Sequence, residues 1–183
     1  MNENIAIILE CNFQAKTWHF SAHNFRMEFD ATDIRLLDLL QSDASLSNQD
    51  LAERAHTSPA TALRRVRRLV DEGVIERRVA LLNPDRVAEG LTALVEVSLD
   101  RQGAEHLDAF EARAVAEVSV QQCYRVSPGP DFVLVLRVAD MQAYNALVQR
   151  LFTQDANVRN VKAFFSVKRA KFDPRMVLTP RAV

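Results

Sequence analysis

The segment from Ser58 to Gly73 restricts the fold more than any other part of the chain, because its composition fits a short basic helix. Ser58 is a favourable N-cap, and Pro59 stands at the first helical position, where its missing N–H has no intrahelical role. Gly73 is a common helix stop. No acid precedes Asp71 in this segment, which carries four arginines: Arg64, Arg65, Arg67 and Arg68. The whole chain has a net charge of −1, so the segment predicts a local basic stripe on a nearly neutral protein.

Two shorter helices are predicted before this one. Asp30 or Thr32 can cap a first helix whose apolar residues recur every three positions from Ile34 to Leu40. Ser47 stands at the start of a second helix, predicted over residues 48–55. Three short helices with tight turns, the last one basic, are typical of a helix-turn-helix.

The period of the apolar residues changes from helical to two after Gly73. Val74–Leu82 is therefore predicted to form a short hairpin or wing strand, which Asn83-Pro84-Asp85 ends with a turn. The N-terminal part of the fold is predicted to be a winged helix-turn-helix.

A helical wheel predicts which residues of the basic helix face outward. The apolar arc, expected to pack on the other two helices, contains Leu63, Val66, Leu69 and Val70. The opposite arc contains Thr57, Thr61, Arg64 and Arg68, with Ala60 and Arg65 at its flanks. Arg67 lies near the apolar border and is predicted to contact phosphate or an acid such as Asp71. The alternative is a solvated helix whose arginines pair with nearby carboxylates.

The second half of the chain alternates strands with helices. Strands are predicted over residues 91–99, 118–126, 132–138 and 158–167, and helices over 104–116 and 141–152. The order is βαββαβ, a ferredoxin-like sandwich, so the fold class of the whole chain is α+β. Two helices cover only one face of such a sheet, and the open face is expected to pack on a partner chain.

These patterns divide the chain into five parts. They are an N-terminal extension (1–26), the winged helix-turn-helix domain (27–82), a hinge (83–90), the ferredoxin-like domain (91–172) and a tail (173–183). Met27 directly precedes the first helical pattern, so translation can start there. The alternative is that residues 1–26 form a short strand and helix that pack on the remainder or on a partner.

Several classes of protein do not fit the sequence. Cys11 and Cys123 stand far apart without clustered histidines, so we expect no disulfide framework and no metal site. No apolar run is long enough for a membrane helix, and the N-terminus does not resemble a signal peptide. The expected location is the cytoplasm. We find no nucleophile–base pair, paired carboxylates or phosphate loop, and so expect no catalytic residues and no cofactor.

Residues 27 to about 178 resemble the Lrp/AsnC family of bacterial and archaeal transcription regulators. The segments that carry the resemblance are 46–52, 57–69, 73–75, 127–132 and 158–161. The resemblance implies double-stranded DNA as a partner, a C-terminal domain that senses an amino acid or a related small molecule, and control of amino-acid metabolism genes. It also implies a homodimer, formed through the sheets, that assembles into tetramers or octamers. The predicted DNA contacts are Ser47, Asn48, Thr57, Ser58, Ala60, Thr61, Arg64, Arg65 and Arg68.

The resemblance places the effector site at the turn between the second and third strands. The residues carried over are Ser127, Gly129, Pro130 and Asp131. Backbone N–H groups around Gly129 can hold an α-carboxylate, and Asp131 can pair with an α-ammonium group. The sequence Ser127-Pro128-Gly129-Pro130-Asp131 departs from the family's usual Thr-Gly-x-x-Asp form, and Pro130 removes one N–H donor. The alternative is that this segment is only a tight hairpin turn.

Two other functions remain open at this point. An architectural DNA-binding protein without an effector would have the same DNA-binding features. A tetrapyrrole decarboxylase has a similar two-domain architecture, but the predicted second domain offers only His106 for such chemistry.

Overall fold

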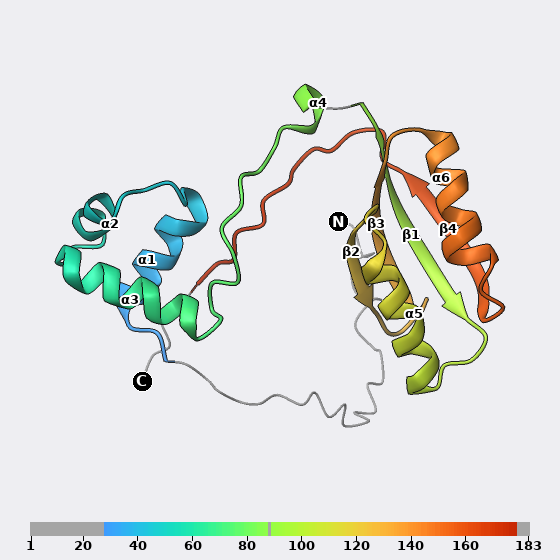
Figure 1. Ribbon diagram of the computed structural model, residues 1–183, viewed down its shortest axis with the longest axis horizontal. Helices are drawn as coiled ribbons and strands as arrows, with labels where there is room; N and C mark the ends of the chain where they lie inside the picture. Colours follow the sequence, from blue (N-terminus) through green and yellow to red (C-terminus); the bar gives the residue numbers. More distant parts are fainter. Residues whose placement is uncertain (1–27, 88, 179–183) are drawn as a thin grey trace, which may run out of the picture. The chain divides into compact units, whose positions relative to one another are not determined.

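The computed structural model describes residues 28–87 and 89–178 (Figure 1). Contacts divide this part of the chain into two compact units, one made of residues 28–78 and 175–178, the other of residues 79–174. The predicted extension over 1–26 and the predicted start at Met27 lie outside the described residues. The predicted domain limits stay a prediction.

The first unit contains three helices that the sequence marks at their N-termini. They are α1 (Ala31–Ser42), α2 (Asn48–Arg54) and α3 (Pro59–Asp71), and their N-caps are Asp30, Ser47 and Ser58. Each cap side chain accepts a backbone N–H of the first turn, which satisfies a donor that the helix itself leaves free. The helices enclose a small core of Leu36, Leu51, Ala52, Ala55, Ala62 and Val66.

The turn between α2 and α3 is tight. His56 has a φ of 54°, a left-handed conformation that is unusual for a residue with a side chain. The N–H of Thr57 then donates to the carbonyl of Ala52 at 2.9 Å, which closes the turn.

The strand or hairpin predicted over 74–82 is wrong. Residues 76–83 have no regular secondary structure, and Val79, Leu81 and Leu82 are exposed. A strand requires a neighbouring backbone for its hydrogen bonds, and no described segment pairs with this one. The predicted turn at Asn83-Pro84-Asp85 is instead the start of a short helix, α4 (Pro84–Val87).

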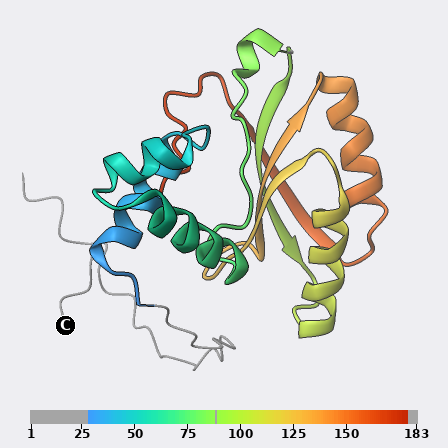
Figure 2. The ribbon, with the colours of Figure 1, turned by 60° about the vertical axis from the view of Figure 1, so that its left-hand side comes forward.

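The second unit is a four-stranded antiparallel sheet with helices on one face. Its strands are β1 (Leu91–Leu99), β2 (Val120–Arg125), β3 (Phe132–Val138) and β4 (Val158–Phe165), in the order β2-β3-β1-β4. The helices α5 (Ala104–Ala116) and α6 (Met141–Val148) lie on the same side of the sheet (Figure 2). A π-helical turn over Gln149–Thr153 continues α6. The βαββαβ order confirms the predicted ferredoxin-like fold.

The core of this unit lies between the sheet and the two helices. Alternate residues of β1 and β3 are buried there, among them Val95, Val97 and Leu134. Phe110 of α5 packs its ring 4.8 Å from that of Phe132 and 6.4 Å from that of Phe152, measured between centroids.

The opposite face of the sheet carries no helix of the described chain. Leu94 lies at its centre, paired with Val135 of β3 and with Phe164 of β4. Leu94 and Phe164 are exposed, and so is Tyr124 of β2, which is paired with Val133 on this face. The described helices are too short or too polar to span a membrane.

A short C-terminal segment belongs to the first unit. The side-chain amide of Gln41 in α1 donates to the carbonyl of Met176 at 3.2 Å and accepts the N–H of the same residue at 2.7 Å. One side chain thereby satisfies both polar groups of a backbone residue far along the chain.

Candidate nucleic-acid interface

The N-termini of α2 and α3 are brought together by a side-chain hydrogen bond. The amide of Asn48, the first residue of α2, donates to the carbonyl of Pro59, the first residue of α3, at 2.8 Å. This bond fixes the position of the basic helix relative to α2. The first N–H groups of α3 carry partial positive charge, and the helix offers only short side chains there, those of Ala60 and Thr61.

Most residues predicted to contact DNA lie around this meeting point. Ser47, Ser58 and Ala60 are exposed, while Asn48, Thr57 and Thr61 are half-buried. Several of these side chains already have local partners. The hydroxyl of Ser47 donates to Asp50, and that of Ser58 donates to Thr61 at 2.9 Å. The fold therefore groups these residues, and their contacts with DNA stay a prediction.

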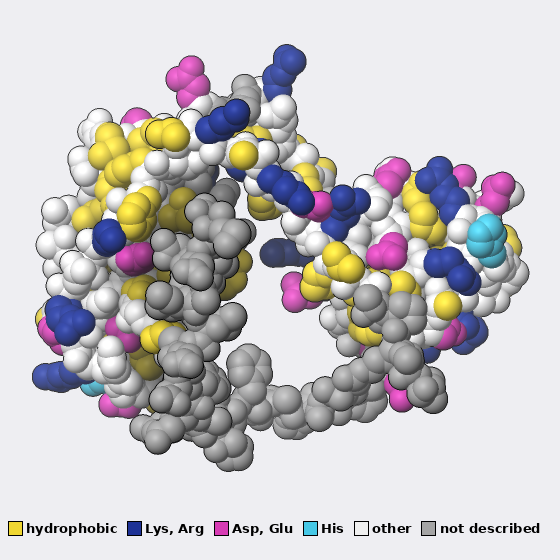
Figure 3. All heavy atoms as spheres, turned by 180° about the vertical axis from the view of Figure 1, so that it is seen from behind, with side chains coloured by type: hydrophobic (Ala, Val, Ile, Leu, Met, Phe, Trp, Pro, Cys, Tyr) yellow, Lys and Arg dark blue, Asp and Glu magenta, His cyan; other side chains and the backbone are white. Residues whose placement is uncertain are grey.

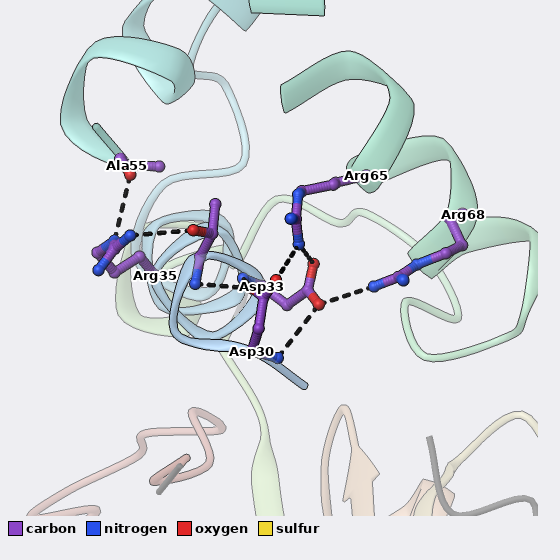
Figure 4. Close-up of polar contacts among 7 residues, drawn as sticks. Asp30, Asp33, Arg35, Ala55, Arg65 and Arg68 are labelled. Carbon is purple, nitrogen blue, oxygen red and sulfur yellow. Dashed lines mark hydrogen bonds and ion pairs between the residues drawn. The ribbon is translucent and has the colours of Figure 1, made fainter. Parts of the chain in front are cut away.

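Two of the predicted arginines point toward α1 (Figure 4). The guanidinium group of Arg65 lies 2.7 Å from a carboxylate oxygen of Asp30 and 2.9 Å from one of Asp33. That of Arg68 lies 2.7 Å from the other oxygen of Asp33. The side chain of Asp33 is only 2% exposed, and its Oδ2 also accepts the N–H of Asp30. For Arg65 and Arg68, the pairing with carboxylates that the sequence left as an alternative is what the structure shows.

The charges of this cluster stabilise one another. The carboxylates of Asp33 and Asp30 raise the pKa of Arg65 above its ordinary value. The pKa of Asp30 is lowered, first because its carboxylate accepts the N–H of Asp33 and also because Arg65 lies beside it. The Nε atoms of Arg65 and Arg68 are buried without a hydrogen-bond partner in the described chain. Each of these buried N–H donors without a partner costs free energy, which the ion pairs with Asp33 offset.

The basic helix is rotated relative to the predicted wheel. Ala62, Val66 and Leu69 are buried, as the spacing of a helix requires for one stripe. Leu63 and Val70, predicted to face inward, are 40% and 44% exposed, so this part of the prediction is wrong. Arg65 and Arg68 form their ion pairs with α1 on one side of this buried stripe.

The rotation leaves two arginines on the outer surface. Arg64 and Arg67 are exposed, and neither has a hydrogen bond or an ion pair within the described residues. Arg67 was predicted to contact phosphate or an acid, and no bond to Asp71 is found. Figure 3 shows positive and negative side chains interspersed on the face that it presents.

Sequence reasoning missed Asp33, the centre of this cluster. The available pattern was the pair Asp30 and Asp33 at the start of α1, which forms a capping box in which each side chain accepts the backbone N–H of the other. The pattern indicates the cap, but the long-range partners of Asp33 depend on how α3 packs.

The predicted effector residues form the turn that joins β2 to β3. Gly129 has a φ of 124°, a conformation that favours glycine, and the Ser127–Pro128 peptide bond is cis. Ser127 and Gly129 are exposed, and Pro130 and Asp131 are half-buried. The N–H of Val126 donates to the carbonyl of Asp131 at 3.0 Å across the turn.

Asp131 has a structural partner in the sheet. One carboxylate oxygen accepts the N–H of Leu99 at 2.6 Å, and the N–H of Asp131 donates to the carbonyl of Val97 at 2.9 Å. Asp131 thus extends the pairing of β3 with β1, and no hydrogen bond to its second carboxylate oxygen is found within the described residues. No cluster of metal-binding side chains occurs in the described part of the chain.

Two segments of the chain match models of known protein families. Residues 29–76 match the model of a winged helix-turn-helix DNA-binding domain, and residues 92–176 match that of an Lrp/AsnC ligand binding domain. The two matches fall on α1–α3 and on the sheet with its helices.

Similar whole proteins exist in several bacteria. An uncharacterised HTH-type transcriptional regulator of Haemophilus influenzae is 35% identical over 156 residues, covering 85% of this chain and 93% of that protein. The leucine-responsive regulatory protein of Escherichia coli K12 is 32% identical over 154 residues, covering 84% and 94%. A transcriptional regulator of Neisseria meningitidis, solved in complex with L-Met, superposes with a TM-score of 0.75 at 30% identity, covering 81% and 96%.

Proposed function

Since this chain belongs to the Lrp/AsnC family of DNA-binding transcriptional regulators, we propose that α3 contacts operator DNA and that the turn after β2 binds an amino acid. The observation that supports the first part is the outer face of α3. This face presents the short residues Ala60 and Thr61 at its N-terminus. Farther along lie Arg64 and Arg67, for which no ion pair is found within the described residues.

The N-terminal half of α3 fits the major groove of duplex DNA. Short side chains let the helix approach base edges, and the N–H groups of its first turn favour a phosphate. Arg64 is proposed to contact a guanine edge or the backbone, with Ser47, Asn48, Thr57 and Ser58 positioning the helix. Arg65 and Arg68, also predicted as DNA contacts, are held by Asp33.

The proposed effector is an amino acid or a related small molecule. The N–H of Gly129, an exposed residue, suits its carboxylate, and the second oxygen of Asp131 suits its ammonium group. Ser127 and Pro130 are proposed to shape the turn. The relative from Neisseria meningitidis is described as a complex with L-Met, which supports this class of ligand.

We further propose a homodimer formed through the open face of the sheet, assembling into tetramers or octamers in the cytoplasm. Leu94 and Phe164 supply exposed apolar surface at the centre of that face. A two-fold dimer predicts a pseudo-palindromic DNA site, with half-sites about one helical turn apart or a multiple of it.

An architectural DNA-binding protein without an effector is the second candidate. The observation that favours it is Asp131, whose carboxylate already accepts the N–H of Leu99. The named relatives are transcriptional regulators, so the decarboxylase alternative is not retained.

The first experiment measures DNA binding by fluorescence anisotropy at one fixed salt concentration. The protein is titrated against DNA from upstream of its own gene and against random duplex, with and without the twenty amino acids. Tight, sequence-selective binding that the amino acids shift supports the effector-responsive regulator. Selective binding that they leave unchanged supports the architectural protein, and no binding to any duplex contradicts both.

The variant Arg64→Gln tests the placement of α3 in the same assay. Its binding free energy for the specific site is expected to weaken by about 1–3 kcal/mol, because a contact to a base edge or phosphate is lost. Arg101→Gln removes an exposed arginine of the second unit and is the matched control. Equal affinities for the two variants would contradict this orientation of α3.

A further inference from the structure

The four arginines of α3 form two classes. Arg64 and Arg67 are exposed and unpaired within the described chain, whereas Arg65 and Arg68 are bonded to Asp33 of α1. We propose that Asp33 is a positioning residue that holds Arg65 and Arg68 against α1, away from the DNA backbone, and so limits sequence-independent binding. This inference rests on the proposed contact between α3 and DNA.

Asp33 is well placed to hold both side chains. Its two carboxylate oxygens take different arginines, at 2.9 Å for Arg65 and 2.7 Å for Arg68. Since the carboxylate is 2% exposed, water and salt screen these pairs weakly. The side chain of Arg65 is only 20% exposed, which leaves little of it accessible to a second partner.

The two arginines depend on Asp33 to different degrees. Arg65 also pairs with Asp30, whereas Asp33 is the only ion-pair partner found for Arg68 among the described residues. The side chain of Arg68 is 38% exposed and lies nearer to solvent. Loss of the Asp33 charge is therefore expected to release Arg68 first.

A released arginine would strengthen binding to any duplex. Each phosphate that a protein neutralises adds about 0.9 to the slope of log affinity against log salt concentration, whatever the sequence. Four free arginines on one helix would therefore raise the affinity for random DNA. Pairing two of them leaves Arg64 and Arg67 as the cations of the outer face.

The test is the salt dependence of binding to random-sequence duplex. Full-length wild type and Asp33→Asn are compared by fluorescence anisotropy from about 50 to about 200 mM salt. Asp33→Asn keeps the shape of the side chain and removes its charge. The slope is expected to steepen by about 0.9, so the loss of affinity over this range grows by about 3.5-fold. The affinity for random duplex is expected to rise above that of wild type at the lower salt concentrations.

Asp38→Asn is the matched control. Asp38 is an exposed acid of the same helix without an ion pair in the described chain, so this variant changes net charge equally. Its slope is expected to equal that of wild type. An equal steepening in both variants would overturn the inference, because net charge alone would then explain it.

A second variant keeps the inference testable if Asp33→Asn does not fold. Arg68→Gln leaves Asp33 paired with Arg65, and its slope is expected to match that of wild type, since Arg68 does not contact phosphate. A slope shallower by about 0.9 would overturn the inference. In the double variant Asp33→Asn/Arg68→Gln, the slope is expected to return to the wild-type value.

The outcomes separate this inference from the proposed function. If wild type binds no duplex, both are wrong. If wild type binds and Asp33→Asn binds more weakly with an unchanged slope, Asp33 is only structural and the inference alone is wrong.

Discussion

Asp30 illustrates how one side chain at the end of a helix serves two purposes. One carboxylate oxygen accepts the N–H groups of Thr32 and Asp33, both at 2.9 Å, and the other binds Arg65. It is therefore both the N-cap of α1 and a member of the ion-pair cluster that orients α3. We expect removal of this side chain to weaken the helix cap more than the ion-pair cluster, because the pair with Arg65 is partly exposed to water.

We expect Asp30→Ala to destabilise the first unit by about 1 kcal/mol, the usual effect of removing a cap. The measurement is urea unfolding, followed by hydrogen exchange of the α1 amides. Asp38→Ala, in the interior of the same helix, is the control and should change stability little. Equal stability of the two variants would show that the cap is not significant.

The same carboxylate predicts a pH dependence. Its pKa is lowered in the folded state, so its contribution is complete above the ordinary aspartate pKa and is lost as pH falls through the lower folded value. The difference in stability between wild type and Asp30→Ala should therefore shrink from about pH 7 to about pH 2. A difference that stays constant over this range would contradict this assignment.

Among the elements, α5 contributes Phe110, one of the largest fully buried side chains, to the core of the second unit. Phe110 is 1% exposed and lies between the rings of Phe132 and Phe152. We expect Phe110→Ala to cost about 3–5 kcal/mol of unfolding free energy, because it removes apolar contact and leaves a cavity. Thermal unfolding measures this loss. The control is Val115→Ala, at an exposed site of α5, whose unfolding free energy should stay within about 0.5 kcal/mol of wild type. Similar losses for both would contradict the central place of Phe110.

The elements also show where sequence reasoning succeeds. Residues 91–99 and 104–116 were predicted with the limits that β1 and α5 have, because alternation and helical spacing are local properties of the chain. The caps Ser47 and Ser58 were likewise predicted correctly, since each acts within its own first turn.

Sequence reasoning fails where the outcome depends on a distant partner. A helical wheel uses only the spacing and the hydrophobicity of residues within one helix, so it places Leu63 and Val70 inward. It does not include the ion pair between Arg65 and Asp33. The period of two over residues 74–82 indicates that this segment is able to form a strand. It does not indicate whether a second backbone lies beside the segment to pair with it. The turn at Ser127–Asp131 was located correctly, whereas the bond from Leu99 to Asp131 required the register of β1 and β3.

At the scale of the whole molecule, we propose that the open face of the sheet is the dimer interface. Leu94 lies at its centre, between Val135 and Phe164. We expect Leu94→Arg to lower the mass measured by light scattering to that of a monomer, because a charge in the middle of an apolar interface is costly to bury. Val118→Arg, at an exposed site just before β2, is the control. An unchanged mass for Leu94→Arg, with circular dichroism showing a folded protein, would exclude this face as the dimer interface.

The contact between Gln41 and Met176 has a consequence for protein engineering. The unit that contains α1–α3 is completed by residues 175–178, so the sheet-containing unit is inserted into it rather than joined after it. A chimeric regulator that keeps this DNA-binding unit and receives a foreign sensor therefore requires two junctions, one on each side of the insert. A single fusion point after residue 78 would leave the amide of Gln41 without the backbone that it binds.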